Sequence, residues 1–161
     1  MSSSYSISSQ KEYLRGARNS TLNTGGGSGT FVVPYDVIID QVGTGLSLNT
    51  TTNRVEVSKS GGYVFTGAIQ TGNYNISTND TVELRVTVYD ASNSPKPYFI
   101  LDHIEADGIN TGSSARLSGT VSLDLEDGES IEVTYVSANT SGALNIIGND
   151  NGTYFTVIRV Y

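Results

Sequence analysis

Strict alternation of apolar and polar residues in short segments is the feature that most constrains how this chain can fold. Within residues 82–88, valine or leucine occupies every second position, with polar residues such as Glu83 and Arg85 between them. Successive side chains of a strand point to opposite faces, so this segment is predicted to be a strand with one buried face. Other short apolar segments lie at 31–39, 53–57, 63–69, 97–104, 117–125, 131–135, 143–147 and 153–161. Turn pairs such as Asp127-Gly128 divide them, and no helical period follows residue 30, so the pattern predicts an all-β sandwich or barrel of nine or ten strands.

Residues 1–30 differ from the rest of the chain because Ser, Thr, Asn and Gly dominate them. The stretch 10–18 is predicted to form about two helical turns, stable only if it packs on a partner. Its apolar stripe would comprise Tyr13, Leu14 and Ala17. The glycine-rich run 25–29 is typical of a flexible linker. The sequence therefore predicts an N-terminal arm and linker over residues 1–30 and a head domain over residues 31–161.

Charge and composition exclude several functional classes. The chain of 161 residues has a net charge of −7, with 3 basic and 1 acidic residue in positions 1–30 against 6 basic and 15 acidic residues beyond. An acidic body argues against nucleic-acid binding, which needs Lys and Arg to neutralise phosphates. The absence of cysteine excludes disulfides and thiolate metal sites. No apolar run is long enough to insert into a membrane. The first residues lack the apolar core of a secretory signal, so we expect the protein either to stay where it is made or to leave without the standard signal.

Catalytic and phosphate-binding motifs are incomplete. The only histidine, His103, follows Asp102 within a predicted strand. Adjacent strand residues point to opposite faces, so these two side chains are expected to diverge. No Gly-x-Ser-x-Gly elbow is present, and no Lys-Ser/Thr pair follows the glycines at 25–29. We therefore expect no enzymatic activity, no catalytic residues and no cofactor.

Two clusters of oxygen-bearing side chains could offer ligands to calcium. They are Asn149–Gly152 and the pair Asp102 and Asp107. Calcium takes six or more oxygen ligands, and the twelve-residue loop that supplies them is missing. Because Asn-Gly is foremost a hairpin turn, no metal site is predicted.

Three stretches together resemble the superfamily of tumour necrosis factor (TNF) and the complement globular heads. They are residues 55–65, which contain Gly61-Gly-Tyr63-Val-Phe65, residues 121–133 around the Gly128 turn, and the terminal run from Tyr154-Phe155 to Val160. The sequence departs from the pattern at Val55, Gly43 and Gly67. The resemblance implies a ten-stranded antiparallel jelly-roll sandwich, here with an extended N-terminal arm, that forms compact homotrimers.

The last predicted strand is apolar on both faces. Phe155 and Val157 lie on one face, and Tyr154, Thr156 and Ile158 lie on the other. A sandwich needs only one buried face, so the second face is predicted to be the trimer interface. The resemblance places Tyr154 near the threefold axis.

These features favour a non-enzymatic structural component of a virus particle, such as a phage head fibre, decoration or spike protein made in the host cytoplasm. Its arm would bind other virion proteins, because a polar segment with scattered apolar groups can order on a partner. The anchoring residues would be Tyr5, Ile7, Tyr13, Leu14, Arg15 and Arg18. The alternative is a trimeric recognition head that binds a host-surface protein or glycan through loops 73–75 and 92–98. A secreted trimeric ligand is less favoured, because no collagen-like stalk is present.

Overall fold

A computed structural model of the chain describes residues 11–23, 28–72, 81–105, 114–138, 145–149 and 151–161. Within these ranges the regular structure is entirely β, with no helix that could span a membrane. The strands are β1 (Tyr13–Ala17), β2 (Leu22–Asn23), β3 (Gly29–Val32), β4 (Val37–Val42), β5 (Leu46–Asn49), β6 (Arg54–Val57), β7 (Gly61–Gln70), β8 (Thr81–Tyr89), β9 (Phe99–Glu105), β10 (Arg116–Leu125), β11 (Ser130–Ser137), β12 (Asn145–Ile146) and β13 (Tyr154–Arg159).

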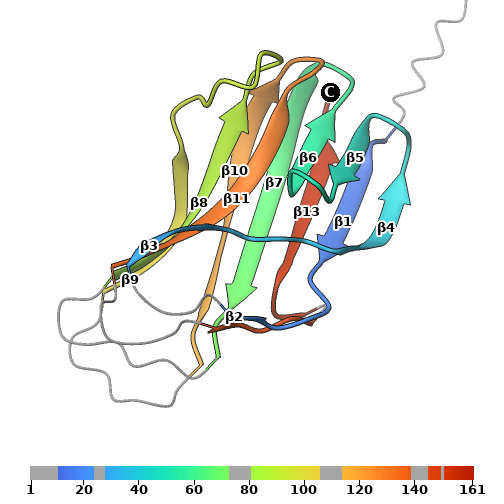
Figure 1. Cartoon of the computed structure of the whole chain (residues 1–161). Helices are drawn as coiled ribbons and strands as arrows, with labels where there is room; N and C mark the ends of the chain where they lie inside the picture. The colour runs from blue at the N-terminus through green and yellow to red at the C-terminus, as the bar shows by residue number, and fades with distance from the viewer. Residues whose placement is uncertain (1–10, 24–27, 73–80, 106–113, 139–144, 150) are drawn as a thin grey trace, which may run out of the picture.

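The strands form two facing antiparallel sheets (Figure 1). Sheet I has the order β10-β7-β13-β1-β4, and sheet II has the order β5-β6-β11-β8-β9, with β3 also paired to β11. From β6 to β13 the chain crosses repeatedly from one sheet to the other. The result is the jelly-roll sandwich that the sequence predicted.

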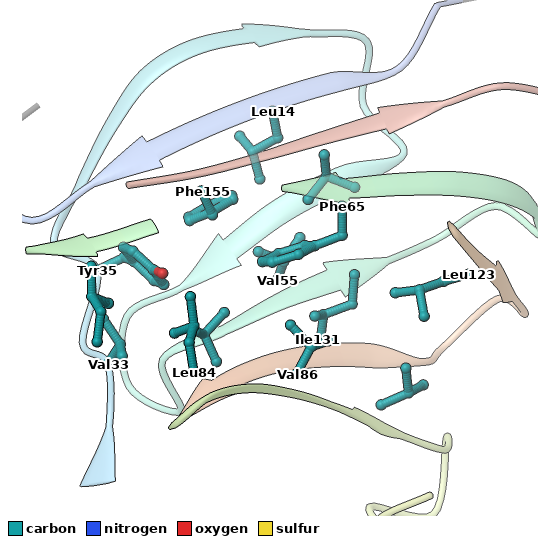
Figure 2. Close-up of a cluster of buried hydrophobic side chains, with 14 of the residues drawn as sticks. Leu14, Val33, Tyr35, Val55, Phe65, Leu84, Val86, Leu123, Ile131 and Phe155 are labelled. Carbon is teal, nitrogen blue, oxygen red and sulfur yellow. The ribbon is translucent and has the colours of Figure 1, made fainter. Parts of the chain in front are cut away.

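Alternating side chains build the core between the sheets (Figure 2). The four apolar residues of β8 are at most 3% exposed, as their spacing predicted. From sheet I, the Phe65 and Phe155 rings stack with centroids 6.2 Å apart, and Tyr35 meets Phe155 edge-on at 4.7 Å. Burial raises the pKa of Tyr35 far above its usual range, so this phenol stays neutral.

The two sheets approach closely where β9 passes over β10. A Cβ added at Gly119 of β10 would lie 2.4 Å from the carbonyl oxygen of Leu101 in β9. Gly67 faces Gly119 across the ladder and is in turn covered by the Leu101 side chain. These two glycines therefore let β9 close this edge of the sandwich.

The expected helix over residues 10–18 is wrong. Tyr13–Ala17 is strand β1, which lies between β13 and β4 in sheet I, and Leu14 is fully buried in the core. A segment this short cannot hold a helix alone, whereas two neighbouring strands satisfy its backbone hydrogen bonds. The arm predicted for residues 1–30 thus contains a strand of the sandwich, and the glycine run connects β2 to β3 rather than an arm to a head.

Smaller differences concern strand limits. The predicted segment 31–39 is divided into β3 and β4, and Pro34 lies between them, as suits a residue that cannot donate to a ladder. Strand β5 was not predicted. Residues 143 and 144 of the predicted segment 143–147 lie outside the described residues.

Candidate interaction surfaces

The outer face of sheet I carries an apolar row across four strands. Tyr13 pairs with Val42 on one side and with Ile158 on the other, and Ile158 pairs with Val64. Leu14 and Val157, the neighbours of Tyr13 and Ile158, are fully buried, so this row points away from the core. Ile158 is 44% exposed although β13 is the middle strand of sheet I, and Val42, at the end of the edge strand β4, is 49% exposed. Large apolar side chains in such a position indicate a contact surface.

Tyr154 and Thr156 share this outer face, as the sequence predicted for all three interface residues. The Tyr154 ring lies between two guanidinium groups, 5.5 Å from Arg15 and 5.7 Å from Arg116. Arg116 also donates a hydrogen bond of 3.3 Å to the Tyr154 hydroxyl. Thr156 pairs with Arg15 and Thr66 in the ladders. The structure therefore places the three residues together; that they contact a second copy stays a prediction.

A groove of about 560 Å³ extends the apolar row at one end of sheet I. Its lining includes Tyr13, Val42 and Ile158 together with Val160 and Tyr161, which are 60% and 73% exposed. We call these five residues the sheet I patch.

A second apolar patch lies on the edge formed by β9 and β10. Phe99 is 44% exposed and Ile100 is 52% exposed, beside half-buried Leu101 and Val121. We call these four residues the β9 edge patch; a hollow of about 650 Å³ lies among them. Figure 1 shows β9 and β4 at opposite edges of the sandwich. The sequence predicted a strand here but not a surface.

Most of the predicted anchoring residues are part of the sandwich. Leu14 is in the core, and Arg18 is 9% exposed and donates a 2.8 Å hydrogen bond to the carbonyl oxygen of Pro34. Tyr13 and Arg15 belong to the outer face of β1. Tyr5 and Ile7 lie outside the described residues, as does loop 73–75. The prediction that these six side chains form one detached anchor is therefore wrong for Leu14 and Arg18.

A buried carboxylate secures the start of β1. Glu12 is fully buried, forms an ion pair with Lys59 and accepts a 2.7 Å hydrogen bond from the Gly45 amide. Glycine is required at position 43 on two grounds. Its φ of +82° is one that other residues rarely adopt, and an added Cβ would lie 2.1 Å from the Glu12 carboxylate. Burial raises the pKa of Glu12, but the hydrogen bonds from Lys59 and Gly45 outweigh it and hold the pKa below its usual range.

Asp102 and His103 do not form a catalytic pair. Both carboxylate oxygens of Asp102 accept backbone hydrogen bonds, one from the His103 amide at 2.9 Å and one from the Ser118 amide at 3.0 Å. Asp102 thus ties β9 to β10. Asn149 similarly accepts a 3.0 Å hydrogen bond from the Asn151 amide inside its own turn. Among the described residues no three His, Asp or Glu side chains gather as metal ligands, and Asp107 and Asp150 lie outside that part of the chain.

Comparisons with known proteins agree on the fold. No family model matches the chain, and no curated protein matches its sequence. Among solved structures, murine APRIL at pH 8.5 superposes with a TM-score of 0.65 at 13% identity, covering 93% of this chain and 99% of that one. Eiger TNF from S. frugiperda superposes with a TM-score of 0.65 at 11% identity, covering 94% of this chain and 92% of that one. The chain therefore has the jelly-roll sandwich fold of TNF-like proteins.

Proposed function

We propose that this chain is a non-enzymatic module that forms a homotrimer, in which the β9 edge patch of one copy docks on the sheet I patch of the next. The observation that carries the proposal is that both patches expose large apolar side chains, one at the β9 edge and one on the outer face of sheet I. Burial of such surface is the main favourable contribution to protein association.

The arrangement of the patches favours a ring. Two different patches that complement each other give a head-to-tail contact, and head-to-tail contacts either close into a ring or continue as a filament. A ring of three follows from the resemblance to the TNF superfamily. The predicted axis residue, Tyr154, lies on the same outer face as the sheet I patch.

Light scattering on patch variants tests this assembly. The wild type is expected at about 51 kDa, three times the 17.1 kDa chain. Ile158→Asp and Ile100→Asp should each give monomers, because each would bury an unpaired charge in the contact. Val32→Asp is the matched control, since Val32 is a similarly exposed residue of β3 outside both patches.

Mixing the two monomeric variants separates a ring from a twofold dimer. Ile158→Asp keeps an intact β9 edge patch and Ile100→Asp keeps an intact sheet I patch, so the mixture should form a heterodimer with one good contact. If Ile100→Asp alone still dimerises, the sheet I patch pairs with itself and the proposed ring is wrong. A monomeric wild type at micromolar concentration also refutes the proposal.

The biological setting that we propose is a virus particle, as a head fibre, decoration or spike protein. The proposal of a virus particle rests on the sequence. Because β1 belongs to the sandwich, we assign the anchor that would bind other virion proteins to residues 1–10, which include Tyr5 and Ile7. Deletion of residues 1–24 would remove β1, so the informative deletion is residues 2–10. Antibodies against the sandwich should label purified particles in electron microscopy, and the deletion should abolish that labelling. A chain found only outside particles would contradict this setting.

A second candidate function is recognition of a host-surface protein or glycan. The observation in its favour is Tyr98, which is 51% exposed at the end of the loop that follows β8.

A further inference from the structure

A groove of about 530 Å³ crosses the outer face of sheet II. Its floor is formed by Thr87 of β8 and Thr134 of β11, and one wall is the segment from Pro95 to Tyr98. Thr30 of β3 lines it as well. The volume is within the range of about 300–1,000 Å³ that is usual for small-molecule sites. We propose that this groove binds a neutral saccharide, which deepens the second candidate function.

The floor presents hydroxyl groups that the protein does not use. The Thr134 residue is 6% exposed, yet its hydroxyl makes no hydrogen bond within the described residues. The Thr87 and Thr30 hydroxyls are also without a partner among those residues. A hydroxyl both donates and accepts, as sugar hydroxyls do. These groups are therefore suited to a ligand that carries many hydroxyls.

Tyr98 supplies an aromatic surface beside these hydroxyls. The Arg85 guanidinium lies 4.3 Å from the ring centroid and covers one side of the ring. Because Tyr98 is 51% exposed, another part of the ring faces solvent. An aromatic ring with a polar hydroxyl can pack on the apolar face of a sugar ring while it hydrogen-bonds at its edge.

The charged groups at the groove are paired with opposite charges. Arg85 donates a 2.7 Å hydrogen bond to Glu83, and Lys96 forms an ion pair with Glu129. Glu132 accepts hydrogen bonds from Arg54 at 3.1 Å and from Tyr89 at 2.9 Å. No cation is left over for a phosphate or carboxylate among the described lining residues. A neutral ligand is therefore favoured over an anionic one.

Hydrogen bonds hold the loop that leads into the wall of the groove. The Asp90 carboxylate accepts hydrogen bonds from the Ser92 hydroxyl at 2.7 Å and from the Ser92 and Ser94 amides at 2.9 and 2.8 Å. The Lys96 amide then donates to the carbonyl oxygen of Val88 at 2.7 Å, which returns the loop to β8. A loop that is held in this way reduces the ordering cost of binding.

The full-length protein should be screened on an array of neutral and acidic glycans, and hits should be measured by calorimetry. We expect a neutral oligosaccharide to bind, with at least a tenfold loss of affinity in Thr87→Val/Thr134→Val and in Tyr98→Ala. Thr51→Val, an exposed threonine in the turn after β5, should bind as the wild type does. All variants should first be shown by light scattering to keep the wild-type mass.

Three results would overturn the proposal: no neutral glycan binds, only acidic glycans bind, or the neutral hit is unaffected by Thr87→Val/Thr134→Val. A decaproline peptide is a further probe, because aromatic grooves also bind proline-rich chains. Binding of that peptide without any neutral glycan would assign the groove to a peptide instead. A monomer that binds the glycan would refute the trimer and leave this site intact, so the two failures are distinguishable.

Discussion

Replacing Lys59 with Met should destabilise the protein more than replacing its partner Glu12 with Gln. Glu12 is fully buried, whereas the Lys59 side chain is 31% exposed. In Lys59→Met the buried carboxylate loses its ion pair, and among the described residues it keeps the hydrogen bond from the Gly45 amide and the more distant charge of Arg159. In Glu12→Gln the amide oxygen can still accept that hydrogen bond, and the Lys59 ammonium can turn toward solvent.

The magnitudes follow from this asymmetry. Removal of one partner of a buried ion pair costs about 3–5 kcal/mol, and the partial exposure of Lys59 places Lys59→Met near the lower end, at about 3 kcal/mol. Glu12→Gln should cost about 1–2 kcal/mol, since no buried charge remains. For a domain of this size, about 3 kcal/mol lowers the Tm by roughly 6–12 °C. The double variant should cost less than the sum of the two, because neither charge is then left alone.

Urea denaturation followed by circular dichroism measures these differences. All proteins must be compared at one concentration, because assembly stabilises the folded state by mass action. A Lys59→Met variant that is as stable as Glu12→Gln, or more stable, would show that the carboxylate is hydrated or paired elsewhere. Strict additivity in the double variant would show that the two side chains do not stabilise each other.

Two further predictions concern acid and the core. The pKa of Glu12 is lower in the folded than in the unfolded protein, so the ionised carboxylate stabilises the fold fully above about pH 5, and this stabilisation is lost as pH falls through the folded pKa. The free energy of unfolding, measured between pH 3 and 7, should therefore fall less with acid in Glu12→Gln than in the wild type. Phe155→Ala should cost about 3–5 kcal/mol in urea unfolding, because the fully buried ring packs on Phe65 and Tyr35. A loss below about 1 kcal/mol would mean that the core closes over the cavity.

Local periodicity was sufficient to predict the fold class. Strand β8 alternates with a period of two, and its apolar residues are buried as that period requires. The terminal strand has apolar residues on both faces, and the structure buries Phe155 and Val157 while it leaves Ile158 exposed. Alternation therefore determines which residues share a face, but where both faces are apolar, as in β13, the packing of the sheets decides which face is buried.

The tertiary structure decided what depends on distant parts of the chain. Tyr13–Ala17 is a strand because β13, near the other end of the sequence, pairs with it, and no local pattern contains that partner. The β9 edge patch exists because β9 is the last strand of sheet II, a property of strand order and not of residues 99–105. The groove combines β3, β8, β11 and the loop after β8, which meet only in the folded sandwich. Periodicity along the chain shows which residues of a strand share a face. The order of the strands in a sheet, and the surfaces that this order creates, follow from long-range pairing that local patterns do not encode.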